Sequence, residues 1–270
     1  MTDRVADIEL GLLLEALYQR YHHDFRSYAR SSLRRRLKVA MSKFGCTSLS
    51  QLQHRLLHEG TMLPDLMDIL TVQVSDMFRD PPYFRALREQ VVPMLRTYPS
   101  LKVWVAGCST GEEAWSMAIL LKEEGLLDRT LIYATDINTH ALEKARAGVY
   151  DIDRISGFSE NYRMAGGRDS LSAYYTASYG KAAFDSSLKA HMTFADHSLT
   201  TDSAFSEVQL ISCRNVLIYF TRELQDRAIG LFSDSLCYKG FLGVGSSESL
   251  RFSGLRHRFE EVDAGNRIRH

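Results

Sequence analysis

The sequence predicts an α/β protein in which a doubly wound, mostly parallel sheet follows an all-helical unit and is interrupted by a small β-subdomain. Three observations carry this prediction. Up to about residue 80, apolar residues recur with the period of amphipathic helices. From Leu101, short apolar runs alternate with helical segments, which is typical of parallel sheets. At Val103–Glu113 one such run ends in a turn bracketed by two glycines and opens a helix, as in sheets that bind nucleotide-like cofactors.

Residues 1–80 are predicted to form the helical unit. Leu10, Leu13 and Leu17 recur at helical spacing in its first segment. Gly45 suits the end of the second helix, and Pro64 is tolerated in the first turn of the fourth. We expect helices at residues 8–25, 28–44, 49–58 and 63–72.

Charge is unevenly distributed along a chain whose formal net charge is zero. Residues 1–50 carry nine Lys or Arg against five Asp or Glu, and Arg20–Lys43 carries eight against one. The second helix is therefore expected to present a positive face, unless that face is merely solvated. The zero balance argues against a general nucleic-acid binder.

A connector is predicted at residues 81–99, where Asp80-Pro81-Pro82 precedes a helix expected at residues 83–95. Together with Tyr83, these residues match a signature of enzymes that methylate exocyclic amino groups of bases. In such enzymes the motif follows a strand and holds a flipped base. Here helical segments lie on both sides of it, so base methylation is disfavoured.

The remaining residues, 100–270, are predicted to form the sheet domain. We expect strands at residues 101–107, 130–137, within 204–215 and at 240–245, and helices at 112–124, 140–147 and 222–237. The segment at about 150–193 is polar, rich in Gly, Ser and Tyr, and too long for a simple connection. We interpret it as the inserted β-subdomain; the alternative is a surface elaboration without a binding role.

Several classes of protein are disfavoured by composition. The four cysteines have neither C-x-x-C nor zinc-ligand spacing, so no metal site is predicted and reduced thiols are expected. No apolar run approaches the roughly 18 residues of a membrane-spanning helix. The first residues are interpreted as the start of a mature helix rather than a signal peptide.

The turn after the first strand favours an amino-acid-bearing cofactor. Gly107 and Gly111 permit close backbone approach, but their spacing fits neither the dinucleotide motif nor the phosphate-binding P-loop. Glu112 and Glu113 follow where a phosphate-binding loop has lysine. Two carboxylates repel phosphate and suit the ammonium of S-adenosylmethionine, so NAD and ATP are disfavoured. The alternative is a structural turn with solvated glutamates.

Two further strand ends supply polar side chains. Asp136 lies 25 residues after Gly111, a separation suited to hydrogen bonds with ribose hydroxyls, although a turn aspartate is the alternative. Arg214, Asn215 and Tyr219 follow a later strand, and ligands of open α/β sheets bind at such carboxyl ends. Core packing is the alternative role for Tyr219.

The sequence resembles the CheR family of chemoreceptor glutamate methyltransferases over nearly its whole length. The resemblance rests on an Arg-rich second helix and on SDMFRDPPYF, AGCSTGEE, ATDIN, ISCRNVLIYF and GSSESL. It implies an N-terminal helical domain on a Rossmann-like methyltransferase domain with an inserted β-subdomain. It also implies S-adenosylmethionine as cofactor, S-adenosylhomocysteine as product, and glutamyl γ-methyl esters on the cytoplasmic part of chemoreceptors.

The resemblance assigns cofactor contacts. Glu112 would hold the amino end of the methionyl group, and Asp136 the ribose. The other contacts would come from Gln73, Ser75, Arg79, Gly107, Ser198, Leu199, Arg214 and Asn215. The chain departs from the family where Gln73 and Ser75 replace Asn and Thr, Ser198 replaces Asn, Ala114-Trp115 replaces Pro-Tyr, and Ser246-Ser247-Glu248 replaces His-Ser-Glu.

The implied reaction needs little acid–base chemistry. A glutamate acceptor, with an ordinary pKa of about 4.3, is already ionised near pH 7 and needs no general base. Arg79 and Tyr219 are the candidates to orient it. The acidic methylation helices of the receptor would be steered by Arg30, Arg34, Arg35 and Lys38 on the second helix.

The resemblance implies methyl-accepting chemoreceptor helices as partner, with no nucleic acid and no membrane insertion. It also implies a monomer in the cytoplasm that is recruited to membrane receptor arrays. Some family members dock on a receptor tail peptide by strand addition to the β-subdomain. The insert is longer here, so we expect no need for that tether. The alternatives are an O-methyltransferase acting on another protein or a small-molecule carboxylate, and a non-catalytic binding module.

Overall fold

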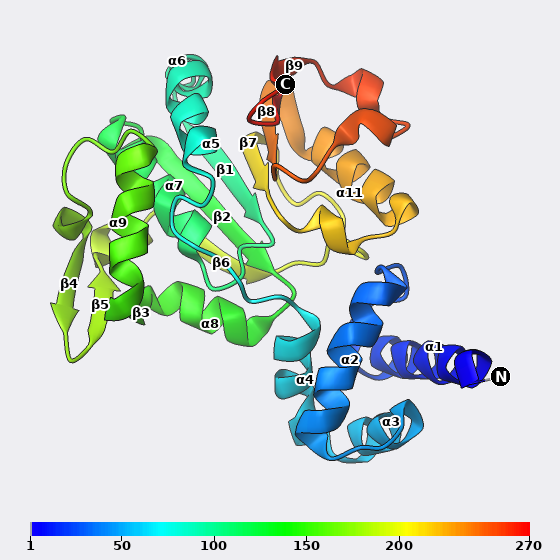
Figure 1. The fold of residues 1–270 in the computed structure, drawn as a ribbon. Coiled ribbons are helices and arrows are strands. Elements are labelled where there is room, and N and C mark those ends of the chain that lie inside the picture. Colours follow the sequence, from blue (N-terminus) through cyan, green and yellow to red (C-terminus); the bar gives the residue numbers. More distant parts are fainter. Residues whose placement is uncertain (1) are drawn as a thin grey trace.

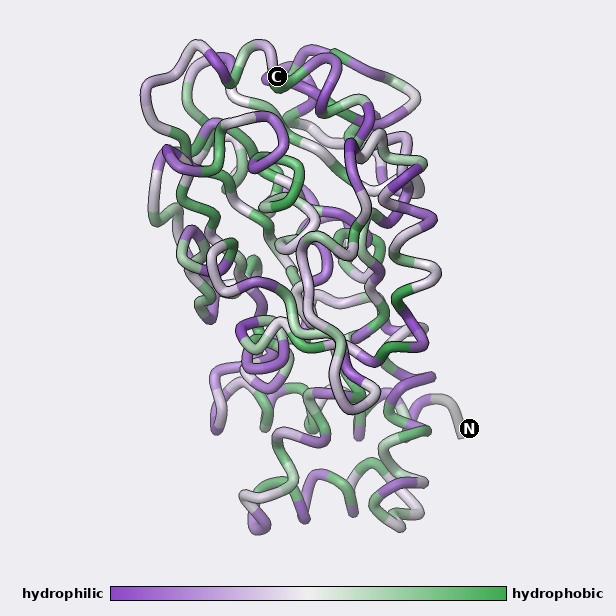
Figure 2. Tube along the Cα trace, turned by 90° about the vertical axis from the view of Figure 1, so that its left-hand side faces the viewer, coloured by the Kyte–Doolittle hydropathy of each residue, from purple (hydrophilic) through white to green (hydrophobic). Residues whose placement is uncertain are grey.

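The computed structural model describes residues 2–270 and shows a helical unit beside a sheet domain (Figure 1). The helical unit comprises α1 (Thr2–Tyr21), α2 (Arg30–Phe44), α3 (Leu49–His58) and α4 (Leu63–Leu70). Gly45 ends α2 in the left-handed conformation, and the Ser48 side chain caps α3 by accepting the Gln51 N–H. The hydropathy colouring of Figure 2 alternates along these helices, as expected of helices that bury one face.

The first helix begins at Thr2 rather than at the predicted residue 8. Val5, in this extra portion, and Ile8, at the predicted start, are more than half exposed. The apolar stripe used to place the start of the helix is therefore absent there. Further along, Leu10, Leu13 and Leu17 are buried as predicted.

The helical unit is joined to the sheet domain by backbone pairing as well as by a shared apolar core. Tyr28 forms an isolated antiparallel bridge with Phe220, and the two rings lie 4.9 Å apart. The Ala29 N–H donates to the Tyr219 carbonyl over 2.8 Å. This pairing places the chain between α1 and α2 against the loop that follows a central strand.

The connector is a single helical rod composed of α5 (Pro81–Ala86), a π-helical turn (Leu87–Val91) and α6 (Val92–Leu95). Pro93 has no N–H with which to continue the α-helical ladder, which explains why the preceding turn widens. The sequence predicted a helix here but not the irregular turn.

The main sheet has seven strands in the order β6-β2-β1-β7-β8-β10-β9. Its members are β1 (Leu101–Ala106), β2 (Thr130–Asp136), β6 (Met192–Asp196), β7 (Val208–Cys213), β8 (Leu236–Val244), β9 (Glu261–Asp263) and β10 (Ile268–Arg269). The first five are parallel, and β9 and β10 are antiparallel additions. The four predicted strands correspond to β1, β2, β7 and β8.

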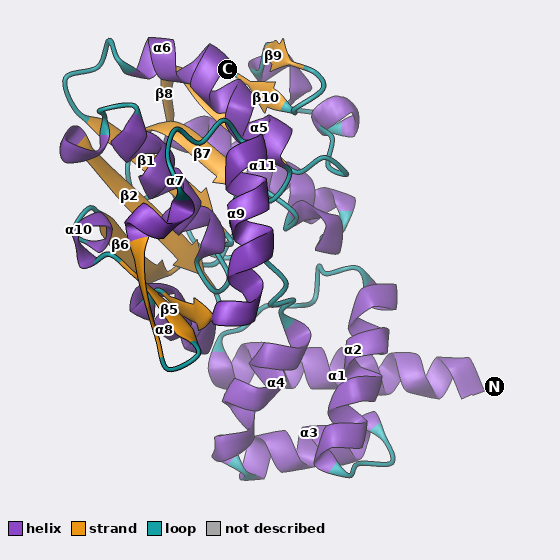
Figure 3. Cartoon of the chain, turned by 60° about the vertical axis from the view of Figure 1, so that its left-hand side comes forward, coloured by secondary structure: helices purple, strands orange, loops and turns teal. Residues whose placement is uncertain are grey.

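Three helices, α7 (Glu112–Glu123), α8 (Thr139–Ala147) and α11 (Arg222–Ser235), connect the strands. The predicted insert contains an antiparallel sheet of β3 (Val149–Asp151), β5 (Lys181–Phe184) and β4 (Tyr175–Ser178), seen beside α9 (Ile155–Met164) in Figure 3. A short helix, α10 (Ser186–Lys189), follows. Residue 193, the predicted end of the insert, falls inside β6. This edge strand was missed because only Met192 and Phe194 are buried in it.

Strand order reverses at β1, which pairs with β2 on one side and β7 on the other. A crevice is expected at the carboxyl ends of the strands at such a switch point. Among the described residues, no helix is long and apolar enough to cross a membrane.

Candidate active site

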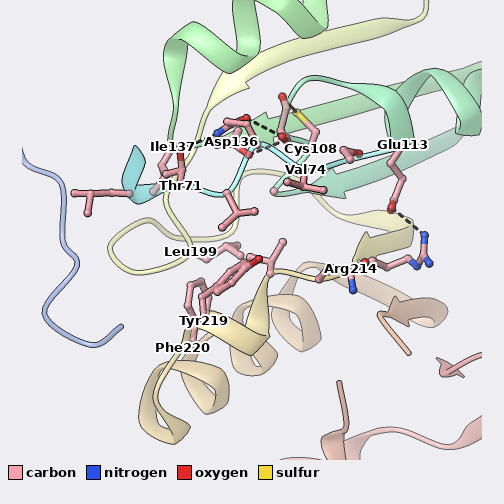
Figure 4. Close-up of a pocket in the computed structure, with 18 of the residues that line it drawn as sticks. Thr71, Val74, Cys108, Glu113, Asp136, Ile137, Leu199, Arg214, Tyr219 and Phe220 are labelled. Atoms are coloured by element: carbon pink, nitrogen blue, oxygen red, sulfur yellow. Dashed lines mark hydrogen bonds and ion pairs between the residues drawn. The ribbon is translucent and has the colours of Figure 1, made fainter. Parts of the chain in front are cut away.

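A cavity lies at this switch point, between the helical unit and the carboxyl ends of the parallel strands (Figure 4). It is lined by most of the predicted cofactor and catalytic residues: Gln73, Ser75, Arg79, Gly107, Asp136, Leu199, Arg214, Asn215 and Tyr219. Glu112 and Ser198 are not among its lining residues, and neither are Arg30, Arg34, Arg35 and Lys38. Residues that the sequence did not single out, Glu113, Tyr28 and Arg36 among them, complete the lining.

The turn after β1 is built for close backbone approach. Gly107 and Gly111 have positive φ angles of 72° and 93°. A Cβ atom on Gly107 would lie 2.4 Å from Cγ2 of Val216, so only glycine fits against the loop after β7. The Gly107 and Cys108 N–H groups both donate to the Thr135 carbonyl over 2.8 Å. These contacts hold the turn against the end of β2.

Asp136 is held at the end of β2 by two backbone donors. Its Oδ2 accepts the Ser109 N–H over 2.8 Å, and its Oδ1 accepts the Asn138 N–H over 2.9 Å. Burial raises the pKa of this carboxyl, although these hydrogen bonds act in the opposite direction. Each oxygen keeps a lone pair, so the carboxylate can accept two hydroxyl groups of a ribose.

The two glutamates that begin α7 have different surroundings. Glu112 is fully buried; its carboxylate accepts the Thr110 hydroxyl and pairs with Arg154 Nη1 at 2.7 Å. Glu113 lines the cavity and pairs with Arg214 Nη1 at 3.0 Å. Successive residues of a helix point about 100° apart, so only one of the pair can face the ligand. The geometry favours Glu113 over the predicted Glu112 for the amino end of the cofactor.

Arg214 is the central charge of the site. Its side chain is 1% exposed, pairs with Glu113 and Asp80, and donates to the Arg79 carbonyl. The guanidinium also lies 4.2 Å from the centre of the Tyr83 ring. Asp80 and Tyr83 of the Asp-Pro-Pro-Tyr motif thus hold an arginine of the cavity.

The part of the cavity formed by α2 and the loop after β7 contains an arginine that the sequence analysis missed. The Arg36 guanidinium lies 4.5 Å from the centre of the Tyr219 ring. Its Nη1 donates to the Leu70 carbonyl, and its Nη2 is buried with no hydrogen-bond partner in the described part of the chain. Arg36 falls at the same helical spacing as Leu33, Leu37 and Ala40, which are buried. A charged residue on the apolar face of a helix was the signal that could have identified it.

The predicted basic residues of α2 lie outside the cavity. Arg30 and Arg34 both pair with Asp7 of α1, so their charge is partly neutralised. Arg35 and Lys38 are exposed. Their place is on the surface of the helical unit, where they can act only on an approaching partner. Among the described residues there is also no cluster of side chains suited to a metal ion.

The Glu112–Arg154 pair connects the inserted subdomain to the cofactor turn. Arg154 also donates to the Ser75 carbonyl and pairs with Asp76 at 3.1 Å. It therefore connects α7 to the segment between α4 and α5, which joins the helical unit to the sheet domain. We expect Arg154→Met to lower the melting temperature and to weaken S-adenosylhomocysteine binding about tenfold, because a buried carboxylate loses its partner. Calorimetry and thermal unfolding measure both effects.

Neutralising the carboxylate provides the control for this prediction. Adding Glu112→Gln to Arg154→Met should recover much of the melting temperature, because no buried charge remains unpaired. Arg163→Met, at an exposed arginine of the same subdomain, should change neither quantity. Additive losses in the double variant would show that the pair is not coupled.

Comparison with known proteins matches both parts of the chain to one family. Residues 8–71 match the all-alpha domain of the CheR methyltransferases, and residues 73–268 match their SAM-binding domain. The cofactor of the protein is therefore S-adenosylmethionine.

Two relatives agree with these matches. A Pseudomonas putida protein named Cher3 is 57% identical over 267 residues, 99% of this chain and 98% of that protein. A Vibrio cholerae chemotaxis protein methyltransferase is 31% identical over 240 residues, 85% and 84% of the two chains. A Geobacter sulfurreducens SAM-dependent methyltransferase, solved with S-adenosyl-L-homocysteine, aligns with 68% of this chain and 53% of its own, at a TM-score of 0.35 and 11% identity. The two family matches together span nearly the whole sequence, and the chain belongs to the CheR family of SAM-dependent methyltransferases.

Proposed function

We propose that this protein transfers the methyl group of S-adenosylmethionine to glutamate side chains on the cytoplasmic part of chemoreceptors, forming glutamyl γ-methyl esters. The observation that carries the proposal is the polarity of the cavity. Asp136 and Glu113 line it from the ends of the strand and helix that form the cofactor turn, whereas Arg36 and Tyr219 line it from α2 and the loop after β7. The Arg36 guanidinium lies over the Tyr219 ring, and its Nη2 has no partner in the described part of the chain. Carboxylates suit the cofactor, and a cation suits an anionic acceptor.

The reaction requires the protein to position the acceptor carboxylate and the methyl group, and it requires no proton transfer. Bound S-adenosylmethionine supplies an electrophilic methyl group, which a carboxylate oxygen takes while the bonding electrons remain on sulfur. Arg36 and Tyr219 would orient the carboxylate, and Arg79, which also lines the cavity, is the third candidate. Closing the helical unit over the acceptor would remove water from its charge. No general base is required because the acceptor is ionised near neutral pH.

Recognition of the receptor would begin on the surface of α2. Arg35 and Lys38 are exposed there and would steer acidic receptor helices toward the cavity. Arg30 and Arg34 would contribute less, because Asp7 pairs with both. We further propose that the protein acts as a monomer in the cytoplasm and is recruited to receptor arrays without needing the receptor tail peptide.

The test is a transfer assay with radiolabelled S-adenosylmethionine and a receptor cytoplasmic fragment. Glutamyl methyl esters release volatile methanol in alkali, so labelled methanol from the fragment supports the proposal. A fragment whose acceptor glutamates are replaced by alanine should release none. Label found only on a small-molecule carboxylate or another protein would replace the receptor as substrate. Cofactor binding without any transfer would indicate a non-catalytic module.

Tyr219→Phe should lower turnover about tenfold while S-adenosylhomocysteine affinity stays within about threefold. The variant keeps the ring under Arg36 and removes only the hydroxyl that would orient the acceptor, a hydrogen bond of about 1–1.5 kcal/mol. Initial rates and calorimetry separate the two effects. Tyr238→Phe, at a tyrosine that is 87% exposed, is the control. Equal turnover with normal binding would remove the Tyr219 hydroxyl from the mechanism.

A further inference from the structure

The loop Asn215–Phe220, after β7, must hold a defined shape for the site to form. Asn215 has a positive φ of 61°, in the left-handed region that asparagine adopts more readily than most other residues with a side chain. Val216 packs against Gly107 in the cofactor turn, and Tyr219 lines the cavity. Because two residues of this loop contact the cavity, the shape of the loop matters for the site, and a restraint from outside the loop would fix it.

That restraint is the carboxylate of Glu248, which is 4% exposed. Its Oε2 accepts the N–H groups of Gly245 and Asn215 over 2.5 and 3.0 Å. Its Oε1 accepts those of Val216 and Ile218 over 2.8 and 3.3 Å. In the described part of the chain the carboxylate forms no ion pair with a cationic side chain. Four backbone N–H groups therefore offset part of the cost of burying the charge, and three of them belong to the loop.

We propose that Glu248 is a positioning residue of methyl transfer, whose carboxylate fixes the Asn215–Phe220 loop so that Tyr219 meets the acceptor. The inference rests on the proposed function for its kinetic part. The hydrogen bonds to Glu248 explain how the loop can keep Val216 and Tyr219 in place. Three donors at Asn215, Val216 and Ile218 bond to one rigid group, and displacement of a reacting geometry by about 1 Å can cost about 100-fold in rate.

Glu248→Gln is the primary variant. Each carboxylate oxygen accepts two N–H groups, so the amide nitrogen faces two donors in either orientation. We expect turnover to fall about tenfold or more, with S-adenosylhomocysteine affinity within about threefold. Amide hydrogen exchange should become faster at Asn215, Val216 and Ile218. Glu207→Gln, at an exposed glutamate before β7, should leave turnover and exchange unchanged.

Gly245→Ala tests the same contact from the other side. The added methyl carbon would lie 2.7 Å from Glu248 Oε2 and 2.9 Å from the Asn215 nitrogen. It should push the carboxylate away from the loop and lower turnover as Glu248→Gln does. If Glu248→Gln fails to bind S-adenosylhomocysteine at all, this variant decides in its place, and normal turnover in it overturns the proposal.

A double-mutant cycle with Tyr219→Phe separates positioning from general stability. If Glu248 acts through Tyr219, Glu248→Gln should cost little more in the Tyr219→Phe background than Tyr219→Phe alone. Additive losses, or unchanged turnover in Glu248→Gln, would overturn the proposal. Should the unmodified protein itself fail to methylate receptor fragments, the proposed function fails. Amide hydrogen exchange in Glu248→Gln then decides whether Glu248 holds the loop. Unchanged exchange rates at Asn215, Val216 and Ile218 would refute the proposal.

Discussion

Replacing Arg36 with methionine is expected to lower kcat/KM for the receptor acceptor about 100-fold, while S-adenosylhomocysteine affinity changes less than about threefold. The guanidinium is buried beside Tyr219, and its Nη2 has no partner among the described residues. Burial also lowers the pKa of Arg36, as expected of a cation that is removed from water. A charge-assisted hydrogen bond of about 1.5–3 kcal/mol corresponds to roughly 10- to 150-fold.

The neighbouring arginine provides the matched comparison. Arg35 lies on the exposed face of α2, so Arg35→Met should cost only a few-fold, and the loss should shrink as salt is added. The loss in Arg36→Met should persist at high salt because the contact is buried. Initial rates at low and high ionic strength distinguish the two roles. Similar losses in both variants would place the acceptor on the surface of α2 rather than at Arg36.

The sheet and the helical unit could be predicted because their patterns are local. Alternating strands and helices after Leu101 and the helical period before residue 80 each depend on neighbours within one element. The edge strand β6 and the helix α9 were missed because their signals are short or embedded in polar sequence. The insert, predicted at about residues 150–193 with short strands, also contains the helix α9, and its last two residues belong to β6.

Residues of the site were predictable where a motif fixes the backbone. Asp136, Arg214 and Asn215 follow strands directly, so strand direction alone brings them to the crevice. The choice between Glu112 and Glu113 depends on how α7 is rotated about its axis. That rotation is set by packing, and by Arg154 from the insert, 42 residues further along the chain.

Arg36 and Glu248 show what sequence reasoning lacks at longer range. The basic count of α2 drew attention to its exposed face, whereas the arginine in the cavity lies on the buried one. Glu248 is 32 residues from Val216, whose N–H it accepts. Both residues acquire their roles only when distant segments meet, and in both the sequence showed a charged group whose partners could not be named.

Asp136→Asn is expected to weaken S-adenosylhomocysteine binding about 30-fold at pH 8, because a charged acceptor of ribose hydroxyls is lost. Burial raises the pKa of Asp136 above that of ordinary aspartates. If the ionised form binds the ribose, affinity is complete above this pKa and declines as the pH falls through it. The affinity of the wild-type protein for S-adenosylhomocysteine should therefore fall on acidification. The affinity of Asp136→Asn should not show this decrease.

Proton release gives this prediction a direct measurement. A ligand that prefers the ionised carboxylate must displace the proton from any Asp136 that still carries one, by linkage. Calorimetry in buffers of different ionisation enthalpy should therefore detect proton release at acidic pH and none at pH 8. Asp136→Asn should abolish the release, whereas Asp128→Asn, at an exposed aspartate, should preserve it. If proton release persists in Asp136→Asn, the proton comes from another group. The proposed contact between an ionised Asp136 and the ribose would then lose its support.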